Sequence, residues 1–243
     1  TYTIVADVAR GTENDYSAFL IFDVSEIPYR IVAKYRSNEI KPLVFPTVIY
    51  ESAKAYNQSY VMIEVNDIGE QVASALHYDL EYDNVVMASM RGRAGQILGS
   101  GFSGAKVQLG VRTTKAVKIL GCSNLKQLIE TDKLIVNDYN LIEEISTFVS
   151  HGQSYQAEQG HTDDLAMCCV LFAWMTNQIY FKELTNLDIR ERMFMEQQDQ
   201  LEQDMAPFGF IVDGLEDSNV GEVVDEYGTR WNPVVRHNGY DNW

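Results

Sequence analysis

Carboxylates stand at positions in this chain where a charge is costly, and such positions indicate chemistry. Asp7 ends one apolar segment, and Glu64 interrupts another. Asp163 and Asp164 open a segment that is apolar on all sides when it is drawn as a helix. A carboxylate withdrawn from water destabilises the fold unless another group pairs with it. Something must therefore compensate these four acids.

Each acid also has an ordinary explanation. Asp7 suits a charged strand end that is hydrogen-bonded into the next turn. One of Asp163 and Asp164 suits a helix N-cap, which the helix dipole favours. That explanation does not cover both acids when the helix behind them is buried. The alternative is a shared metal site, because Mg²⁺ takes oxygen ligands and leaves positions open for water and phosphate.

Two further residues are weaker candidates for the same site. Asp15 opens the second predicted strand and would lie near Asp7, but a carboxylate in a turn has the same residue pattern. His161 precedes the two aspartates and would support the ligands or transfer a proton. A single histidine near a helix start is also common without any function. The sequence leaves both residues open.

The apolar patterns predict the elements that must position these acids. Short loops separate the first three strands, so we expect an antiparallel meander with Asp7 at one end. The expected strands span residues 2–8, 16–24, 29–37, 60–65, 85–88, 134–136 and 154–158. The expected helices span residues 43–57, 66–80, 122–132, with Ser123 as N-cap, 139–149 and 163–174.

Charge is distributed unevenly along the chain. The formal net charge is -16, which by itself argues against nucleic-acid binding. Between Asp83 and Glu130, however, every charged residue is basic. Residues 91–118 are also rich in glycine, and we expect a mobile basic hairpin that contacts a phosphate backbone. The candidate contacts are Arg91, Arg93, Lys106, Arg112, Lys115 and Lys118.

The glycine-rich segment is not a nucleotide-binding P-loop. That motif requires lysine directly after its second glycine, and Ala105 stands there instead. A solvated surface loop is the alternative to phosphate contact. We expect residues 1–182 to form the core domain, with residues 91–118 as an insertion. Residues 183–243 are strongly acidic, and we expect a helix and an irregular tail that pack on the core or extend from it.

The remaining composition places the chain in a broad class. No apolar run approaches the roughly 18 residues of a membrane span. The three cysteines, Cys122, Cys168 and Cys169, suit free thiols in a reducing cytoplasm. The chain begins at Thr1 on a core strand, so we expect an excised domain or a processed product.

Several motifs, taken in order, make a resemblance specific. They are Asp7-Val-Ala-Arg-Gly-Thr-Glu-Asn-Asp15-Tyr, Ile63-Glu64-Val-Asn, Gly121-Cys-Ser-Asn-Leu-Lys-Gln-Leu-Ile-Glu130, Asp132-Lys-Leu-Ile and Gly160-His-Thr-Asp163-Asp164-Leu-Ala-Met. Together they resemble the nuclease domain of the large terminase subunit of tailed bacteriophages, of the myovirus type. The resemblance covers residues 1–182 well and the acidic tail only loosely.

The resemblance implies a fold and a reaction. The fold would be α/β and ribonuclease H-like, of the RuvC and integrase type, with a mixed sheet flanked by helices. The reaction would be metal-dependent cutting of concatemeric double-stranded viral DNA at the start and end of headful packaging. Asp7, Glu64 and Asp164 would be catalytic metal ligands, joined by Asp163. Asp15 and His161 would support them.

The resemblance also implies cofactors and partners. Two Mg²⁺ ions, or Mn²⁺ in their place, would activate water and stabilise the leaving oxygen of a phosphodiester. The partners would be double-stranded DNA, an N-terminal packaging ATPase domain, the portal protein and the small terminase subunit. The location would be the host cell cytoplasm, on the procapsid. This chain has no Walker motif and matches only the nuclease half.

Two other functions remain open. A Holliday-junction resolvase-like nuclease has the same fold but needs a dimer interface, which the acidic tail does not support. A non-catalytic module that grips DNA or docks on a portal would carry the acids as remnants. Metal binding discriminates the nuclease from the gripping module. An actin-like ATPase is excluded because its phosphate-binding glycine turns are missing after the strands.

Overall fold

The computed structural model describes residues 1–10, 15–89, 96–98, 107–152, 154–182, 185, 223–224 and 230–231. The chain divides into two units, Thr1–Met195 and Glu196–Trp243. In the second unit the described residues form two short antiparallel strands, β11 (Val223–Val224) and β12 (Arg230–Trp231). The candidate site residues described below belong to the first unit.

A mixed sheet of five strands is the centre of the first unit. It consists of β1 (Tyr2–Asp7), β2 (Ser17–Asp23), β3 (Tyr29–Ser37), β4 (Tyr60–Ile63) and β8 (Leu134–Ile135). The spatial order is β4-β1-β2-β3-β8. β1, β2 and β3 form the expected antiparallel meander, while β4 runs parallel to β1 and β8 parallel to β3.

Side chains along each strand point alternately to the two faces of the sheet, and each face has its own hydrophobic core. Val5 and Ala18 belong to one buried cluster, whereas Ile4 and Ala6 belong to the other. Successive side chains of a strand point to opposite faces. Asp7 therefore points to the same face as Val5. The same rule places Glu64 on that face, because Met62 belongs to the cluster of Val5.

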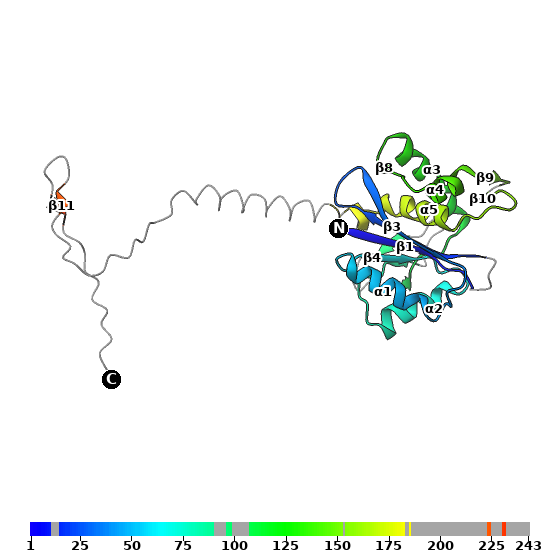
Figure 1. Ribbon diagram of the computed structural model, residues 1–243, viewed down its shortest axis with the longest axis horizontal. Helices are drawn as coiled ribbons and strands as arrows, with labels where there is room; N and C mark the ends of the chain where they lie inside the picture. The colour runs from blue at the N-terminus through cyan, green and yellow to red at the C-terminus, as the bar shows by residue number, and fades with distance from the viewer. Residues whose placement is uncertain are drawn as a thin grey trace. The chain divides into compact units, whose positions relative to one another are not determined.

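Helices cover both faces of the sheet (Figure 1). On one face lie α1 (Phe45–Ala55) and α2 (Gly69–Ser74), and α2 continues as a π-helical turn, Ala75–Asp79. On the other face lie α3 (Lys115–Glu130), α4 (Tyr139–Ser146) and α5 (Asp164–Thr176). No helix in the described part of the chain is both long and apolar enough to cross a membrane.

α5 is the central helix of its layer and is buried on all sides, as its sequence predicts. Every residue from Leu165 to Thr176 is buried. Phe172 stacks on Phe22 of β2 with ring centroids 3.8 Å apart. Each fully buried large apolar side chain contributes about 1.5–3 kcal/mol to folding. This packing fixes the helix against β1 and β2, and so fixes the position of its first residues.

Smaller sheets surround this framework. β5 (Met87–Ser89) pairs antiparallel with β6 (Gln96–Leu98) on one side and with β7 (Val107–Leu109) on the other. β9 (Phe148–His151) and β10 (Ser154–Ala157) form a hairpin between α4 and α5. The predicted strand at 85–88 thus belongs to a small sheet. Parallel bridges from Val85 to Val61 and from Val111 to Glu64 join this sheet to the β4 edge of the main one.

The structure corrects the predicted bounds of the basic segment. α3 begins at Lys115, and the side chain of Thr114 caps it by accepting a hydrogen bond from the Val117 N–H at 3.2 Å. The prediction of Ser123 as N-cap is therefore wrong, and Lys115 and Lys118 lie on a helix rather than in a loop. The threonine cap was missed because the flanking Lys115–Lys118 stretch is weakly amphipathic. β6 and β7 pair with β5 and not with each other, so the described parts do not form one hairpin.

Several other predictions fall on residues outside the described ranges. Arg91, Arg93 and Lys106 are among them. Most of the acidic segment after Lys182 is among them too, so its helix and the domain boundary at 182 stay predictions.

The helix predicted at 139–149 ends earlier, at Ser146, because the residues from Phe148 onward pair in the β9–β10 hairpin.

We predict that Gly121→Ala destabilises the fold by about 1–3 kcal/mol, the usual cost of overpacking. A Cβ at Gly121 would lie 2.5 Å from the backbone oxygen of Val170, where α3 crosses α5. Helix propensity alone gives the opposite sign, since alanine is better than glycine by about 1 kcal/mol. Urea unfolding measures the difference. Ser123→Ala, at an exposed position of α3, is the control and should change stability little; a stabilised Gly121→Ala would contradict the close packing.

Candidate active site

The parallel pairing of β1 and β4 brings Asp7 and Glu64 together. The register aligns Thr3 with Tyr60 and Ala6 with Ile63, so Asp7 and Glu64 come next on the two strands. The N–H of Glu64 continues the ladder by donating to the Ala6 carbonyl oxygen at 2.8 Å. Both side chains point to the α5 face. The two carboxyl groups interact, and this interaction is one of the causes that raise the pKa of Asp7.

The N-terminus of α5 reaches the same edge of the sheet. Asp163 is the residue before the helix and Asp164 is its first residue. The charges of both act on Asp7, together with the charge of Glu64. The structure thus brings together Asp7, Glu64, Asp163 and Asp164, which are far apart in the sequence.

The surroundings of Asp7 disfavour its charge. The residue as a whole is half-buried, but the atoms around its carboxyl group withdraw it from water. This burial raises the pKa of Asp7 well above its ordinary value. The negative charge of Glu64 and the hydrogen bond to its side chain raise the pKa of Asp7 further, as do the charges of Asp164 and Asp163. A cation beside Asp7 would offset both the burial and the repulsion.

Asp164 is in a similar state. Burial, with the nearby charges of Glu144 and Asp163, raises the pKa of Asp164 to about 7, against the opposing effect of Arg36. Within the described part of the chain its Oδ2 atom is buried and accepts no hydrogen bond. The backbone N–H of Tyr16 bonds to the carboxyl group. An unsatisfied buried oxygen is a position that a cation would fill.

Backbone contacts hold Glu64 in place. Its side chain is buried, and Asn66 Nδ2 donates to Glu64 Oε1 at 2.8 Å. A Cβ at Gly69 would lie 1.9 Å from the Glu64 carbonyl oxygen, so only glycine lets α2 start this close. Val111 bridges Glu64 on its other side. Sequence analysis did not identify Asn66, although it stands two residues after Glu64.

Arg36 and Glu144 also lie at the site, although the sequence pattern did not predict them there. Arg36 Nη2 lies 3.2 Å from Glu144 Oε1 and 3.8 Å from Asp164 Oδ2. Glu144 lies three residues after Leu141 and is buried with it on the inner face of α4. A charge on an apolar stripe was the signal that could have revealed it. Nothing in the sequence marked Arg36 in the same way. Basic residues recur at alternate positions of β3, which is also the pattern of a strand with one exposed face.

The weaker candidates lie farther out. Asp15 is exposed, one residue before the Tyr16 N–H that bonds to Asp164. His161 is exposed and lines a polar pocket of about 170 Å³ together with Arg36 and Glu144. Their supporting roles stay predictions.

Three of the predicted DNA contacts are described. Arg112 and Lys115 are exposed, and they follow Val111, the residue that bridges Glu64. Lys118 is only 18% exposed, and its Nζ lies 3.8 Å from Asp163 Oδ2. Basic side chains therefore border the acidic cluster on the α3 side.

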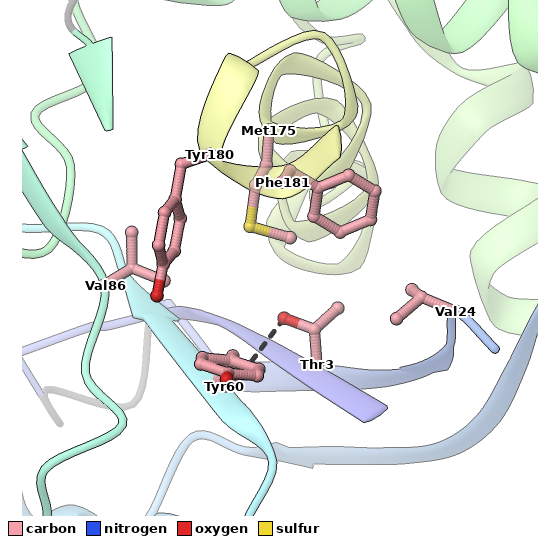
Figure 2. Close-up of a pocket in the computed structure, with 7 residues that line it drawn as sticks. All are labelled: Thr3, Val24, Tyr60, Val86, Met175, Tyr180 and Phe181. Carbon is pink, nitrogen blue, oxygen red and sulfur yellow. Dashed lines mark hydrogen bonds between the residues drawn. The ribbon is translucent and has the colours of Figure 1, made fainter. Parts of the chain in front are cut away.

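An apolar pocket at the other end of the strands is not part of this site (Figure 2). Thr3 and Tyr60, at the start of β1 and β4, line it from below, and Met175 and Phe181 close it. Thr3 Oγ1 donates to the Tyr60 carbonyl oxygen at 3.0 Å. The volume is about 10 Å³, roughly the space of one water molecule. It is a small packing defect, and no acidic, basic or cysteine side chain among the described residues lines it.

The donor set at the acidic cluster fits a hard divalent cation, because all of its donors are carboxylate oxygens. The described residues contain no three His, Cys, Asp or Glu side chains already spaced as a finished metal site. In the structure the carboxyl groups of Asp7 and Glu64 interact with each other, and Arg36 Nη2 lies 3.8 Å from Asp164 Oδ2. Binding of a cation would require these side chains to draw together around it.

We predict that Asp164→Asn stabilises the metal-free protein at pH 8 by roughly 2–4 kcal/mol. The folded-state pKa of Asp164 is about 7, above the ordinary 3.8. Between these values the folded state holds a proton that the unfolded state has released, so wild-type stability falls as pH rises through the window. The advantage of the variant should shrink toward pH 4. Urea unfolding in EDTA checks this, and an advantage that does not change with pH would contradict it.

Comparisons with known proteins agree with this architecture. Residues 4–175 match the family described as the terminase RNase H-like domain. The fold is similar to crystal structures of the large terminase nuclease from thermophilic phage G20c. With bound cobalt and with bound magnesium the TM-score is 0.52, the identity 21%, and the match covers 72% of this chain and 80% of the other. A third structure gives a TM-score of 0.51 at 20% identity, covering 70% and 79%. The expected ribonuclease H-like fold is confirmed, and the chain belongs to the terminase RNase H-like domain family.

Proposed function

We propose that this domain is a metal-dependent endonuclease that hydrolyses the phosphodiester bonds of double-stranded DNA. The observation that carries the proposal is the convergence of Asp7, Glu64, Asp163 and Asp164 at one edge of the sheet. Carboxylates crowded in this way are costly for the fold, and a purely structural role does not account for them. Family membership and the fold shared with a nuclease crystallised with cobalt and with magnesium support the same reaction.

Asp7, Glu64 and Asp164 would hold the metal, with Asp163 beside them. The expected ion is Mg²⁺, which Mn²⁺ can replace. Two such ions would supply an activated water and a stabilised leaving oxygen. The protein keeps the ligands in place: the strand ladder fixes Asp7 and Glu64, Asn66 orients the Glu64 carboxylate, and the buried α5 helix presents Asp163 and Asp164.

The DNA backbone would approach from the α3 side. The exposed residues Arg112 and Lys115 follow closely after Val111, which bridges Glu64. The N-terminus of α3 adds its partial positive charge. An open hollow of about 510 Å³ runs from Lys115 to Tyr155 of β10. Contacts of this type recognise phosphates and not bases, which implies little sequence specificity. Arg91, Arg93 and Lys106 would extend the same surface.

In the packaging process, the proposed cuts are those that begin and end headful filling from concatemeric viral DNA. The partners would be a packaging ATPase domain N-terminal to this one, the portal protein and the small terminase subunit. The work would take place in the host cell cytoplasm. Terminase family membership is the support for this context.

We predict that the domain converts supercoiled plasmid to nicked and linear forms in Mg²⁺ and not in EDTA. Asp7→Asn should reduce the rate at least ~1000-fold, because it removes the carboxylate on which the other acids converge. Agarose-gel time courses measure the rate. Asp138→Asn, at the N-cap of α4, is a control that alters a structural carboxylate and should retain activity.

Two results would argue against the proposal. If Asp7→Asn cuts as fast as the wild type, Asp7 does not belong to the catalytic centre. If the folded wild type binds DNA but never cuts it in Mg²⁺ or Mn²⁺, the domain is a gripping module, or its activity requires the ATPase half.

We predict that Lys115→Ala weakens binding to duplex DNA several-fold and lowers the slope of log K against log salt by about one. The physical reason is the loss of one phosphate contact and of the counterion that it releases. Fluorescence anisotropy with a labelled duplex in Ca²⁺, at several salt concentrations, measures both quantities. Lys54→Ala, an exposed lysine of α1 on the opposite face of the sheet, is the matched control. Equal slopes for all three proteins would exclude Lys115 from the DNA surface.

A further inference from the structure

The N-terminus of α5 is capped from another helix. Glu144 of α4 accepts hydrogen bonds on Oε2 from the backbone N–H groups of Leu165 at 2.7 Å and Ala166 at 3.0 Å. Asp163, which occupies the N-cap position, makes no capping bond with its side chain. Glu144 thus satisfies two of the orphan N–H groups at the start of the helix. Both aspartates are left available for another purpose.

Arg36 occupies the space between Glu144 and Asp164. Ala18 of β2 stands between Asp7 and Arg36 in one row across the sheet, and its small side chain leaves room above it. The guanidinium carbon of Arg36 lies 3.9 Å from the centre of the Tyr16 ring. Arg36 also donates to Thr162 Oγ1, which in turn donates to Glu144 Oε1 at 3.1 Å. These contacts hold the Arg36 guanidinium against Glu144, a carboxylate that is not among the proposed metal ligands.

Arg36 lies closer to Glu144 than to Asp164. Its Nη2 is 3.2 Å from Glu144 Oε1 but 3.8 Å from Asp164 Oδ2, beyond hydrogen-bonding range. The side chain of Glu144 is 5% exposed and that of Arg36 is 22% exposed, so water screens this pair weakly. Glu144 therefore competes with Asp164 for the arginine.

We propose that Arg36 and Glu144 are a positioning pair that keeps Asp164 available to a divalent cation. Glu144 holds the arginine off Asp164 and holds the helix end at the same time. The inference rests on the proposed function, because it concerns the same carboxylate site. Without the Glu144 charge, Arg36 turns to Asp164, occupies its oxygen and repels an incoming cation. Partners of this kind change metal affinity by about 10–100-fold.

The test is calorimetric titration of Mn²⁺ into metal-free protein, without DNA. Glu144→Gln keeps the shape of the side chain and an oxygen that can accept the helix N–H groups. It should weaken Mn²⁺ binding about tenfold. Arg36→Gln should bind Mn²⁺ at least as tightly as the wild type. The double variant should return to within about threefold of the wild type, because neither charge is left unopposed.

Two controls separate this charge effect from damage to the fold. Glu143→Gln changes the charge one residue away at an exposed position of α4 and should leave Mn²⁺ affinity unchanged. Thermal melting in EDTA reports whether each variant is folded before titration. If a variant melts early, Arg36→Lys with Glu144→Asp, which keep both charges, should retain Mn²⁺ binding.

The outcomes distinguish this inference from the proposed function. Unchanged Mn²⁺ affinity in Glu144→Gln overturns the positioning role. A double variant as weak as Glu144→Gln also overturns it, because Glu144 would then act only as a helix cap. If the wild type does not bind Mn²⁺, or Asp164→Asn binds it equally well, the metal site itself is wrong and this inference fails with it.

Discussion

The structure depends on the cost of bringing four carboxylates together at one edge of a sheet. Burial and mutual repulsion raise the pKa of Asp7 and of Asp164. A fold can hold such a cluster only if its scaffold is stable by other means. The buried α5 helix, packed on β1 and β2 and stacked through Phe172, provides that stability.

The surrounding charges are arranged to limit this cost without removing it. Arg36 and Lys118 lie 3.8 Å from Asp164 and Asp163, close enough to reduce repulsion but too far to bond to them. Glu144 takes the nearer contact with Arg36 and the capping bonds of α5. The carboxylates still repel one another, which is the electrostatic condition that favours a cation between them.

The net negative charge of the chain contrasts with a local group of basic residues near the acidic cluster. A net charge of -16 repels DNA at long range, so contact must come from a local surface. In the proposed function Arg112 and Lys115 would provide one near Glu64, because the chain runs from β7 past Val111, which bridges Glu64, into α3. Substrate approach would therefore be restricted to the side on which the acids lie.

The sequence alone determined the meander and the buried helix behind Asp163 and Asp164. These follow from local period and from apolar content, which neighbours in the chain decide. It did not determine the start of α3, because the Thr114 cap precedes a weakly amphipathic turn. Only the tertiary structure revealed Asn66, Arg36 and Glu144 at the site. Their roles depend on contacts between separate elements, and the charge of a side chain says nothing in advance about which distant partner will neutralise it.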